Sequence, residues 1–311
     1  MMKYIKDYIE EGGHFEGPLL VKTCEKGVAN NGNDYLTIVF QDVTGSLNGK
    51  KWTVESDDLT ILTPGKVVFV YGDVFKYKGH PQIKVEKIHP LEENQYDIQD
   101  FYISCPIKEE ALYKELDEMV ALIEDSDLKE LVKYVLSSNE EKYMTYPAAV
   151  SVHHAYRCGI VYHSLSIARM AIKVCEAYPI LNRDYLIAGA LLHDLGKTRE
   201  MAGVIAPNYT FEGNMLGHIS MGFTMVMEAG QKIGIPSEKL NVIGNMILAH
   251  HGQFEYGSPV KPQTPEALVL HMLDDLDAKM NILENFLKDT KVGEFSQKIP
   301  FLDNKAFLRT K

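Results

Sequence analysis

The chain has 311 residues, of which 45% are hydrophobic and 24% are charged, and its formal net charge is −11 at pH 7. This composition is that of a globular protein long enough for two domains, and the acidic charge argues against a general nucleic-acid coat protein while leaving room for a local basic groove. The sequence has no apolar run of the roughly 20 residues that cross a bilayer, and its acidic start lacks a signal-peptide pattern, so we expect no membrane association.

Residues 1 to 90 have the alternating pattern of short β-strands. Clear examples are YLTIVF (35–40) and KVVFVYGDVFKYKG (66–79), and turn-like segments such as DVTGSLNG separate the strands. Several short strands with turns between them predict a small closed or partly closed barrel.

The strand region also combines aromatic side chains with lysines. The aromatic residues are Tyr35, Trp52, Phe75 and Tyr77, and the lysines are Lys50, Lys51, Lys66, Lys76, Lys78, Lys84 and Lys87. This mixture suits sequence-tolerant binding of single strands, because every base offers a π-face. Strands are also rich in aromatic residues for packing reasons, and lysines protect exposed strand edges, so a structural explanation stays open. We take Tyr35 and Trp52 as candidate substrate-binding residues.

A change of pattern separates this region from the rest of the chain. The segment LEENQYDIQDFYISCP (91–106) is polar and ends in proline, which is typical of a linker. From about Ile107 the apolar residues follow a helical period, so we expect an all-α domain over residues 107–311.

Potential metal ligands recur through this helical region, within residues 145–290. They are His163, His193, Asp194, His218, His250, His251 and Asp274. Imidazole nitrogens and carboxylate oxygens suit borderline and hard divalent ions. Each residue alone has a structural explanation, such as an ion pair between Asp194 and Lys197. So many buried ionisable groups would nevertheless need partners, and a shared metal cluster supplies them together.

Local patterns indicate where some of these ligands lie. We expect His193 and Asp194 to close a helix, with Gly196 as its C-terminal cap, and the His250-His251 pair to end another helix before a glycine. Asp274 projects from the buried stripe of the last long helix. Its neighbours Asp275 and Asp277 are expected to lie outside the ligand set or in solvent, although either could replace Asp274.

At this point the chain resembles the HD superfamily of metal-dependent phosphohydrolases. His163, the pair His193-Asp194 and Asp274 match its four-ligand set, and His218, His250 and His251 resemble the added ligands of its two-metal members. Lys197, in HDLGK, matches a lysine that in related enzymes neutralises or protonates at the phosphate. Almost the whole chain, including CPIKEE and HHAYRCGIVYHSLSIA, is similar to the YhaM-type 3′→5′ exoribonucleases. The resemblance implies a five-stranded OB-fold barrel over residues 1–90 followed by an all-α HD domain.

The resemblance also implies a reaction. We expect a metal-dependent 3′→5′ exoribonuclease in which a metal-bound hydroxide attacks the terminal phosphodiester and releases a nucleoside 5′-monophosphate. Asp194 and Lys197 would be catalytic, and His153, His154 and Arg157 would join Lys197 in contacting the substrate. One or two divalent ions are expected, with Mn²⁺ the best candidate and Fe²⁺, Co²⁺ and Mg²⁺ open. Single-stranded RNA is the expected substrate, with single-stranded DNA a further candidate.

Two alternative functions are compatible with these residues. The alternatives are an HD phosphohydrolase acting on free nucleotides or cyclic dinucleotides, and a non-catalytic single-strand-binding protein, which would have no need for the ligand series.

The four scattered cysteines indicate reduced thiols and a cytoplasmic location. Phe295, Phe301 and Phe307 near the C-terminus could pack on a second copy in a homo-oligomer or fold back on their own domain.

Overall fold

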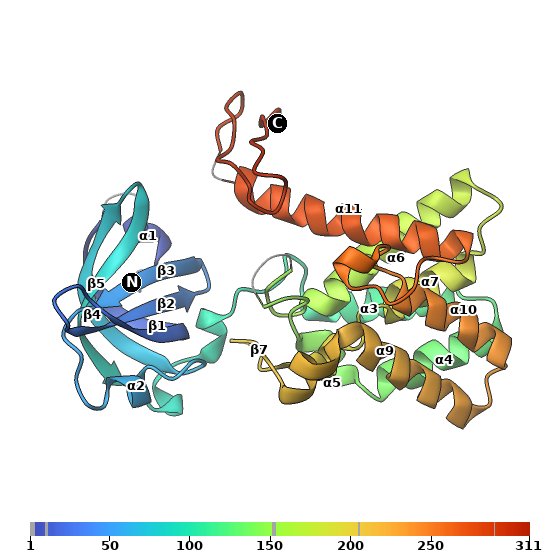
Figure 1. Cartoon of the computed structure of the whole chain (residues 1–311), viewed down its shortest axis with the longest axis horizontal. Coiled ribbons are helices and arrows are strands. Elements are labelled where there is room, and N and C mark those ends of the chain that lie inside the picture. Colours follow the sequence, from blue (N-terminus) through green and yellow to red (C-terminus); the bar gives the residue numbers. More distant parts are fainter. Residues whose placement is uncertain (1–3, 10–11, 151–153, 205, 289) are drawn as a thin grey trace. The chain divides into compact units, whose positions relative to one another are not determined.

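The computed structural model describes residues 4–9, 12–150, 154–204, 206–288 and 290–311. The chain forms two compact units, and the division along the linker falls between Ser104 and Cys105. Figure 1 shows a strand-rich unit followed in the chain by a helical one. Each unit is described by itself.

The first unit is a closed barrel of five strands, as the sequence predicted. The strands are β1 (Gly13–Val28), β2 (Asp34–Asp42), β3 (Gly45–Lys51), β4 (Val67–Tyr77) and β5 (His80–Pro90), and their order around the barrel is β1-β2-β3-β5-β4. All neighbouring pairs are antiparallel except β3 and β5. Alternation fills the interior, since Leu36, Ile38 and Phe40 of β2 are all fully buried. Two short helices, α1 (Lys6–Ile9) and α2 (Asp58–Ile61), complete this unit.

The segment after the barrel packs against it. It contains two short 3-10 helices, η1 (Glu93–Gln95) and η2 (Ile98–Phe101). Phe101 is buried against Leu20 and Val67, and its carbonyl oxygen accepts a hydrogen bond of 3.0 Å from Gln41 Nε2. Much of the segment expected as a linker over residues 91–106 is therefore attached to the barrel.

The second unit is a bundle of helices. They are α3 (Glu109–Ala121), α4 (Ser126–Ser137), α5 (Glu140–Thr145), α6 (Gly159–Ala177), α7 (Arg183–Leu192), α8 (Lys197–Glu200), α9 (Phe211–Ile233), α10 (Ser237–Leu248) and α11 (Pro265–Leu287), with the 3-10 helix η3 (Phe254–Tyr256). Helix α7 forms the centre, since every residue from Leu186 to Leu192 is buried, and it contacts α4, α6, α10 and α11. Two antiparallel strands of two residues each, β6 (Met201–Ala202) and β7 (Asn208–Tyr209), were not predicted.

Gly196 does not have the role that the sequence suggested. Helix α7 ends at Leu192, and Gly196 has a right-handed φ of −57° directly before α8. A Cβ atom on Gly196 would lie 1.9 Å from the carbonyl oxygen of His218 and 2.6 Å from the nitrogen of Gly222. The prediction of a C-terminal cap was therefore wrong, and the position requires glycine because α8 and α9 approach closely here.

The C-terminal tail folds beside the end of α11. Arg309 Nη1 donates hydrogen bonds to the carbonyl oxygen of Leu287, the last residue of that helix, and to that of Thr290, which follows it. Phe295 and Phe301 are exposed, whereas Phe307 is half-buried. Among the helices described, none is long and apolar enough to span a membrane.

Candidate metal centre

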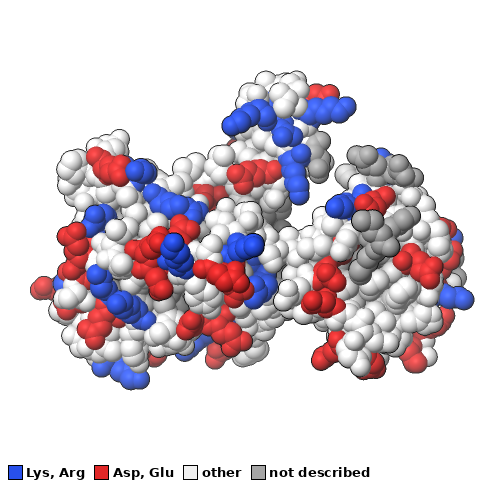
Figure 2. Space-filling model, turned by 180° about the vertical axis from the view of Figure 1, so that it is seen from behind, with Lys and Arg blue, Asp and Glu red and all other residues white. Residues whose placement is uncertain are grey.

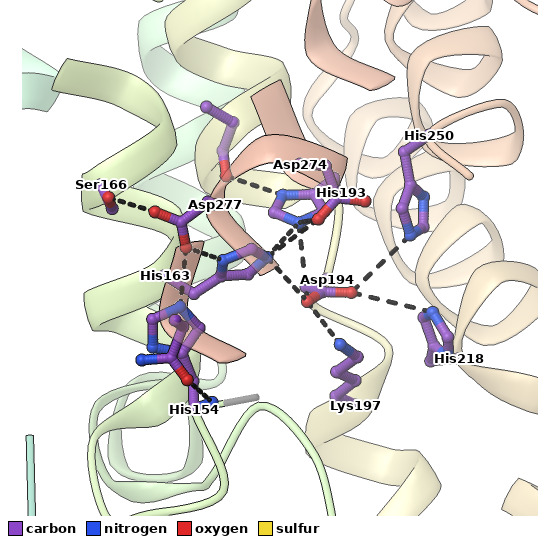
Figure 3. A network of polar contacts seen from close by, with 12 residues as sticks. His154, His163, Ser166, His193, Asp194, Lys197, His218, His250, Asp274 and Asp277 are labelled. Carbon is purple, nitrogen blue, oxygen red and sulfur yellow. Dashed lines mark hydrogen bonds and ion pairs between the residues drawn. The ribbon is translucent and has the colours of Figure 1, made fainter. Parts of the chain in front are cut away.

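All metal ligands predicted from the sequence lie close together in the helical unit. They are His163 of α6, His193 and Asp194 directly after α7, His218 of α9, His250 and His251 after α10, and Asp274 of α11. Figure 3 shows Asp194 in the middle of this group, with histidines on both sides of its carboxylate.

One oxygen of Asp194 faces the first set of ligands. Asp194 Oδ2 lies 3.7 Å from His163 Nε2 and 3.5 Å from His193 Nε2. Asp274 Oδ1 lies 3.0 Å and 3.9 Å from the same two nitrogens. Separations of about 3 to 4 Å between ligand atoms are what a shared ion requires when each atom binds it at about 2.1 Å.

The other oxygen of Asp194 faces the second set. Asp194 Oδ1 lies 3.7 Å from both His218 Nε2 and His250 Nε2. These three atoms are buried and have no hydrogen-bond partner among the described residues. His251 belongs to the same set. One ring nitrogen from each of His218, His250 and His251 lies within 4.8 Å of the other two. Buried polar atoms without partners are costly, and a cation between them would satisfy all three.

Every one of these histidine rings is oriented by its other nitrogen. The Nδ1 atoms of His193, His250 and His251 donate to backbone carbonyl oxygens of Ala190, Ile247 and Tyr256 at 2.9, 2.6 and 2.8 Å. The Nδ1 atoms of His163 and His218 donate to carboxylates of Asp277 and Glu200 at 2.7 and 3.0 Å. Because these oxygens only accept, Nδ1 carries the proton, and Nε2 is left as the ligand atom.

The electrostatics of the centre favour cation binding. Burial opposes ionisation of Asp194, but Lys197 and the surrounding histidines hold its pKa well below the usual range. Burial likewise opposes ionisation of Asp274, but its hydrogen bond with His163 and the nearby imidazoles together outweigh this and lower its pKa. Burial lowers the pKa of His193 and His250. Burial also opposes protonation of His163, but Asp274 and Asp277 raise its pKa to about 9, so a metal must displace a proton there. The centre therefore combines ionised carboxylates with the neutral imidazoles of His193 and His250, which are donors that suit a divalent metal ion.

Two residues around the centre were not identified as functional from the sequence. Glu200, on α8, holds His218 through both its ring and its backbone nitrogen. Ser166, on α6, donates a short hydrogen bond to Asp277, which holds His163. Nothing in the local pattern distinguishes them, because their partners come from distant segments.

The structure separates the three aspartates of α11. Asp274 faces the ligands, and Asp277 lies behind His163. Asp275 is half-exposed and pairs with Lys279 at 2.7 Å on the surface. The geometry thus favours Asp274 over Asp275 as a ligand. Lys197 Nζ is 2.6 Å from Asp194 Oδ2, so the ion pair considered from the sequence coexists with the cluster.

The predicted phosphate-contacting residues differ in position. His153 lies outside the described residues. His154 is buried, and its Nε2 donates to Asp277 at 2.7 Å, so it lies behind His163 rather than at a surface. Arg157 forms an ion pair with Glu109 of α3. Of this predicted set, Lys197 lines the cavity beside the metal centre.

That cavity has a volume of about 500 Å³. Its walls include Lys197, His218, His251 and Asp274, together with the exposed rings of Tyr209 and Tyr256. A volume of this size falls within the roughly 300–1,000 Å³ of small-molecule sites.

The barrel carries the other predicted contact surface. The rings of Tyr35 and Trp52 lie 5.2 Å apart, and Lys50 Nζ lies 4.2 Å from the centre of the Tyr35 ring. Gly27 makes room for Tyr35, because a Cβ atom there would lie 2.6 Å from its ring. Trp52 is half-exposed. These three residues therefore form a small cationic and aromatic platform.

The wider distribution of charge on the barrel is mixed. Lys51 is buried and paired with Asp58 at 2.7 Å, so its inclusion among the lysines suited to single-strand binding was wrong. On the face that Figure 2 draws, acidic side chains prevail over basic ones on the strand-rich unit. Any attraction for nucleic acid must therefore be local, as at Lys50.

Comparisons with known proteins agree with both units. Residues 160–279 match the HD domain family, and residues 20–91 match a family described as an OB-fold nucleic acid binding domain. The chain is 37% identical to the 3′-5′ exoribonuclease YhaM of Geobacillus sp. (strain WCH70), over 99% of this chain and 95% of that protein. It is 36% identical to YhaM of Bacillus subtilis (strain 168), over 96% of each. The second OB-fold domain of replication protein A from Methanococcus maripaludis aligns with 24% of this chain and 81% of its own at 22% identity, with a TM-score of 0.20.

Proposed function

Because this chain belongs to the YhaM family of 3′-5′ exoribonucleases, we propose that it removes nucleotides from the 3′ end of single-stranded RNA and releases nucleoside 5′-monophosphates. Membership makes it a hydrolase with an HD domain. The observation that carries the mechanism is the carboxylate of Asp194, whose two oxygens face two separate sets of histidine nitrogens.

The residues of the centre divide into two binding positions. His163, His193 and Asp274 would hold one divalent ion, while His218, His250 and His251 would hold a second, and Asp194 would bridge them. When bound, such ions lower the pKa of water and stabilise charge on phosphoryl oxygens. With nitrogen and oxygen ligands we expect Mn²⁺ to serve best, ahead of Fe²⁺, Co²⁺ and Mg²⁺.

Lys197 is the residue best placed to act on the phosphate. Its ammonium group is buried, and although burial opposes protonation, Asp194 raises its pKa so that it stays charged. It also lines the cavity beside the ligands. We propose that Lys197 Nζ neutralises charge on the scissile phosphate or donates a proton to the leaving 3′-oxygen.

The barrel would hold the strand while the 3′ end is cleaved. The platform of Tyr35, Lys50 and Trp52 offers π-faces and one cation, which suit stacking with little base preference. We expect single-stranded DNA to bind there as well. All four cysteines are free thiols, which supports a reducing, cytoplasmic setting.

Self-association is the remaining part of the proposal. Phe295 and Phe301 of the C-terminal tail expose 68% and 57% of their surface, and a second copy could cover them. Replacing both by serine should then lower the molar mass measured by light scattering. An unchanged mass would mean that these rings do not hold an oligomer together.

A time course on 5′-labelled single-stranded RNA tests the activity. Wild-type protein with Mn²⁺ should produce a ladder that shortens from the 3′ end, and both EDTA and the Asp194→Ala variant should prevent it. RNA left intact by folded, metal-loaded protein would contradict the proposal and favour hydrolysis of free nucleotides.

A further inference from the structure

Two exposed tyrosines stand beside the metal centre without a role in the mechanism above. Tyr209 and Tyr256 expose 53% and 69% of their surface, and both line the cavity that contains Asp274 and Lys197. They come from different segments, Tyr209 from β7 and Tyr256 from η3. Two large rings therefore border the space in front of the ligands.

The backbone of each tyrosine is tied to the centre. The carbonyl oxygen of Tyr256 accepts the 2.8 Å hydrogen bond that orients His251. Tyr209 pairs with Met201 in the β6–β7 hairpin, and the next residue, Thr210, donates its backbone N–H to the carbonyl oxygen of Glu200 at 2.9 Å. Glu200 in turn holds His218. Each ring is thus presented from a backbone that is fixed relative to a metal ligand.

The faces of both tyrosine rings are open to a ligand. In the part of the chain that the structure describes, no aromatic or cation–π contact is found for Tyr209 or Tyr256. An exposed aromatic face next to a phosphodiester-cleaving centre is suited to stack on a nucleobase, because bases that are out of a helix stack on tyrosine side chains.

We propose that Tyr209 and Tyr256 form the subsite for the last two nucleobases at the 3′ end of the substrate, one on each ring. The inference rests on the proposed exoribonuclease function and adds how the end is recognised. Stacking places the terminal phosphodiester beside Asp194 and Lys197 and reads no base edge. The subsite therefore accepts any base, but it requires that bases be present and unpaired.

The test uses RNAs that lack a base at the last or the next-to-last position. With full-length, Mn²⁺-loaded wild-type protein, kcat/KM should fall roughly tenfold or more for each abasic RNA relative to the intact strand, as expected for the loss of one stack. Tyr209→Leu and Tyr256→Leu keep apolar bulk but remove the π-face. Each variant should abolish the preference for a base at one of the two positions. Tyr209→Phe and Tyr256→Phe should retain it.

A matched control and the contrary outcomes complete the test. Tyr178, at the end of α6, is also exposed but does not line the cavity, so Tyr178→Leu should keep the preference. Wild-type protein that cleaves intact and abasic strands equally well would overturn the subsite while leaving the exoribonuclease intact. Equal losses on all strands in the leucine variants would assign the tyrosines a structural role only and also overturn it. If no RNA were cleaved, the proposed function and the subsite would fall together.

Discussion

Removing the carboxylate of Asp277 should weaken metal binding, although Asp277 is not itself one of the predicted ligands. Its Oδ2 accepts hydrogen bonds of 2.7 Å from both His163 Nδ1 and His154 Nε2, and its Oδ1 accepts one from Ser166. These bonds fix the ring whose Nε2 faces the first ion position. Residues that orient a ligand in this way typically contribute about 10- to 100-fold to metal affinity, which is about 1.4 to 2.7 kcal/mol.

Two substitutions at this position should give graded effects. In Asp277→Asn the amide oxygen can still accept from both histidines, and the amide nitrogen can donate to Ser166, so only the charge is lost. We expect the lower end of the range, about tenfold. Asp277→Ala removes every bond and leaves buried ring N–H groups without partners. It should approach a hundredfold loss and also cost about 1–3 kcal/mol of stability for each unpaired group.

Asp275→Asn is the matched control. It makes the same chemical change on the same helix, but Asp275 is half-exposed and pairs with Lys279. Its effect on metal affinity should be less than about twofold, because exposed ion pairs contribute little. Calorimetric titration of metal-stripped protein with Mn²⁺ measures the affinities, and melting curves in chelator report the stability. Wild-type affinity in both Asp277 variants would refute the reasoning, as would an equal loss in the control.

Four further results are expected. Asp194→Ala should abolish RNA hydrolysis, and in denaturant titrations of the metal-free protein it should cost about 3–5 kcal/mol, because it leaves the buried ammonium of Lys197 unpaired. Burial opposes protonation of His163, but Asp274 and Asp277 raise its pKa to about 9 in the metal-free protein. Protonated His163 therefore stabilises the folded state, and this stabilisation is complete below the ordinary pKa of 6.5 and is lost as the pH rises through about 9. Because the metal must displace that proton, the rise in melting temperature on adding Mn²⁺ should grow over the same range, and a flat profile would count against ligation by His163. Trp52→Ala should weaken binding of long single strands by about 1–3 kcal/mol in fluorescence titrations, and an unchanged affinity would exclude the barrel platform. Gly196→Ala should cost about 1–3 kcal/mol or more in thermal unfolding, since its Cβ would lie 1.9 Å from a carbonyl oxygen of α9, whereas a neutral result would mean that α8 and α9 can separate.

The sequence predicted those features whose cause is local. Alternation at Leu36, Ile38 and Phe40 shows directly which face of β2 fills the barrel. Helical spacing likewise placed Asp274 on the buried face of α11. Asp277 follows three residues later and therefore lies on the same face of the helix. Asp275 is turned by about 100° and points to solvent, so its exposure also follows from the spacing.

Features that depend on distant partners could not be predicted. Lys51 lies on the same face of β3 as the buried Leu47 and Gly49, but the partner that allows a lysine to be buried there, Asp58, comes from α2. Glu200 has the spacing of a helix-end residue, and its role arises only because α9 brings His218 to it. Gly196 shows a different limit, since a left-handed cap and a close approach both require the absence of a Cβ atom, and the sequence does not distinguish them.

His193 and His250, which follow the ends of two helices, show how local and distant causes combine. The last carbonyl oxygens of a helix have no partner within it. In α7 the carbonyl of Ala190 accepts from the ring of His193, and in α10 the carbonyl of Ile247 accepts from the ring of His250, three residues later in both cases. Each helix end thus satisfies one of its own free carbonyls and, by the same bond, turns a ring so that Nε2 faces Asp194. The number of residues between each helix end and its ligand can be predicted from the sequence. That the two helix ends meet at one carboxylate depends on how the helices pack.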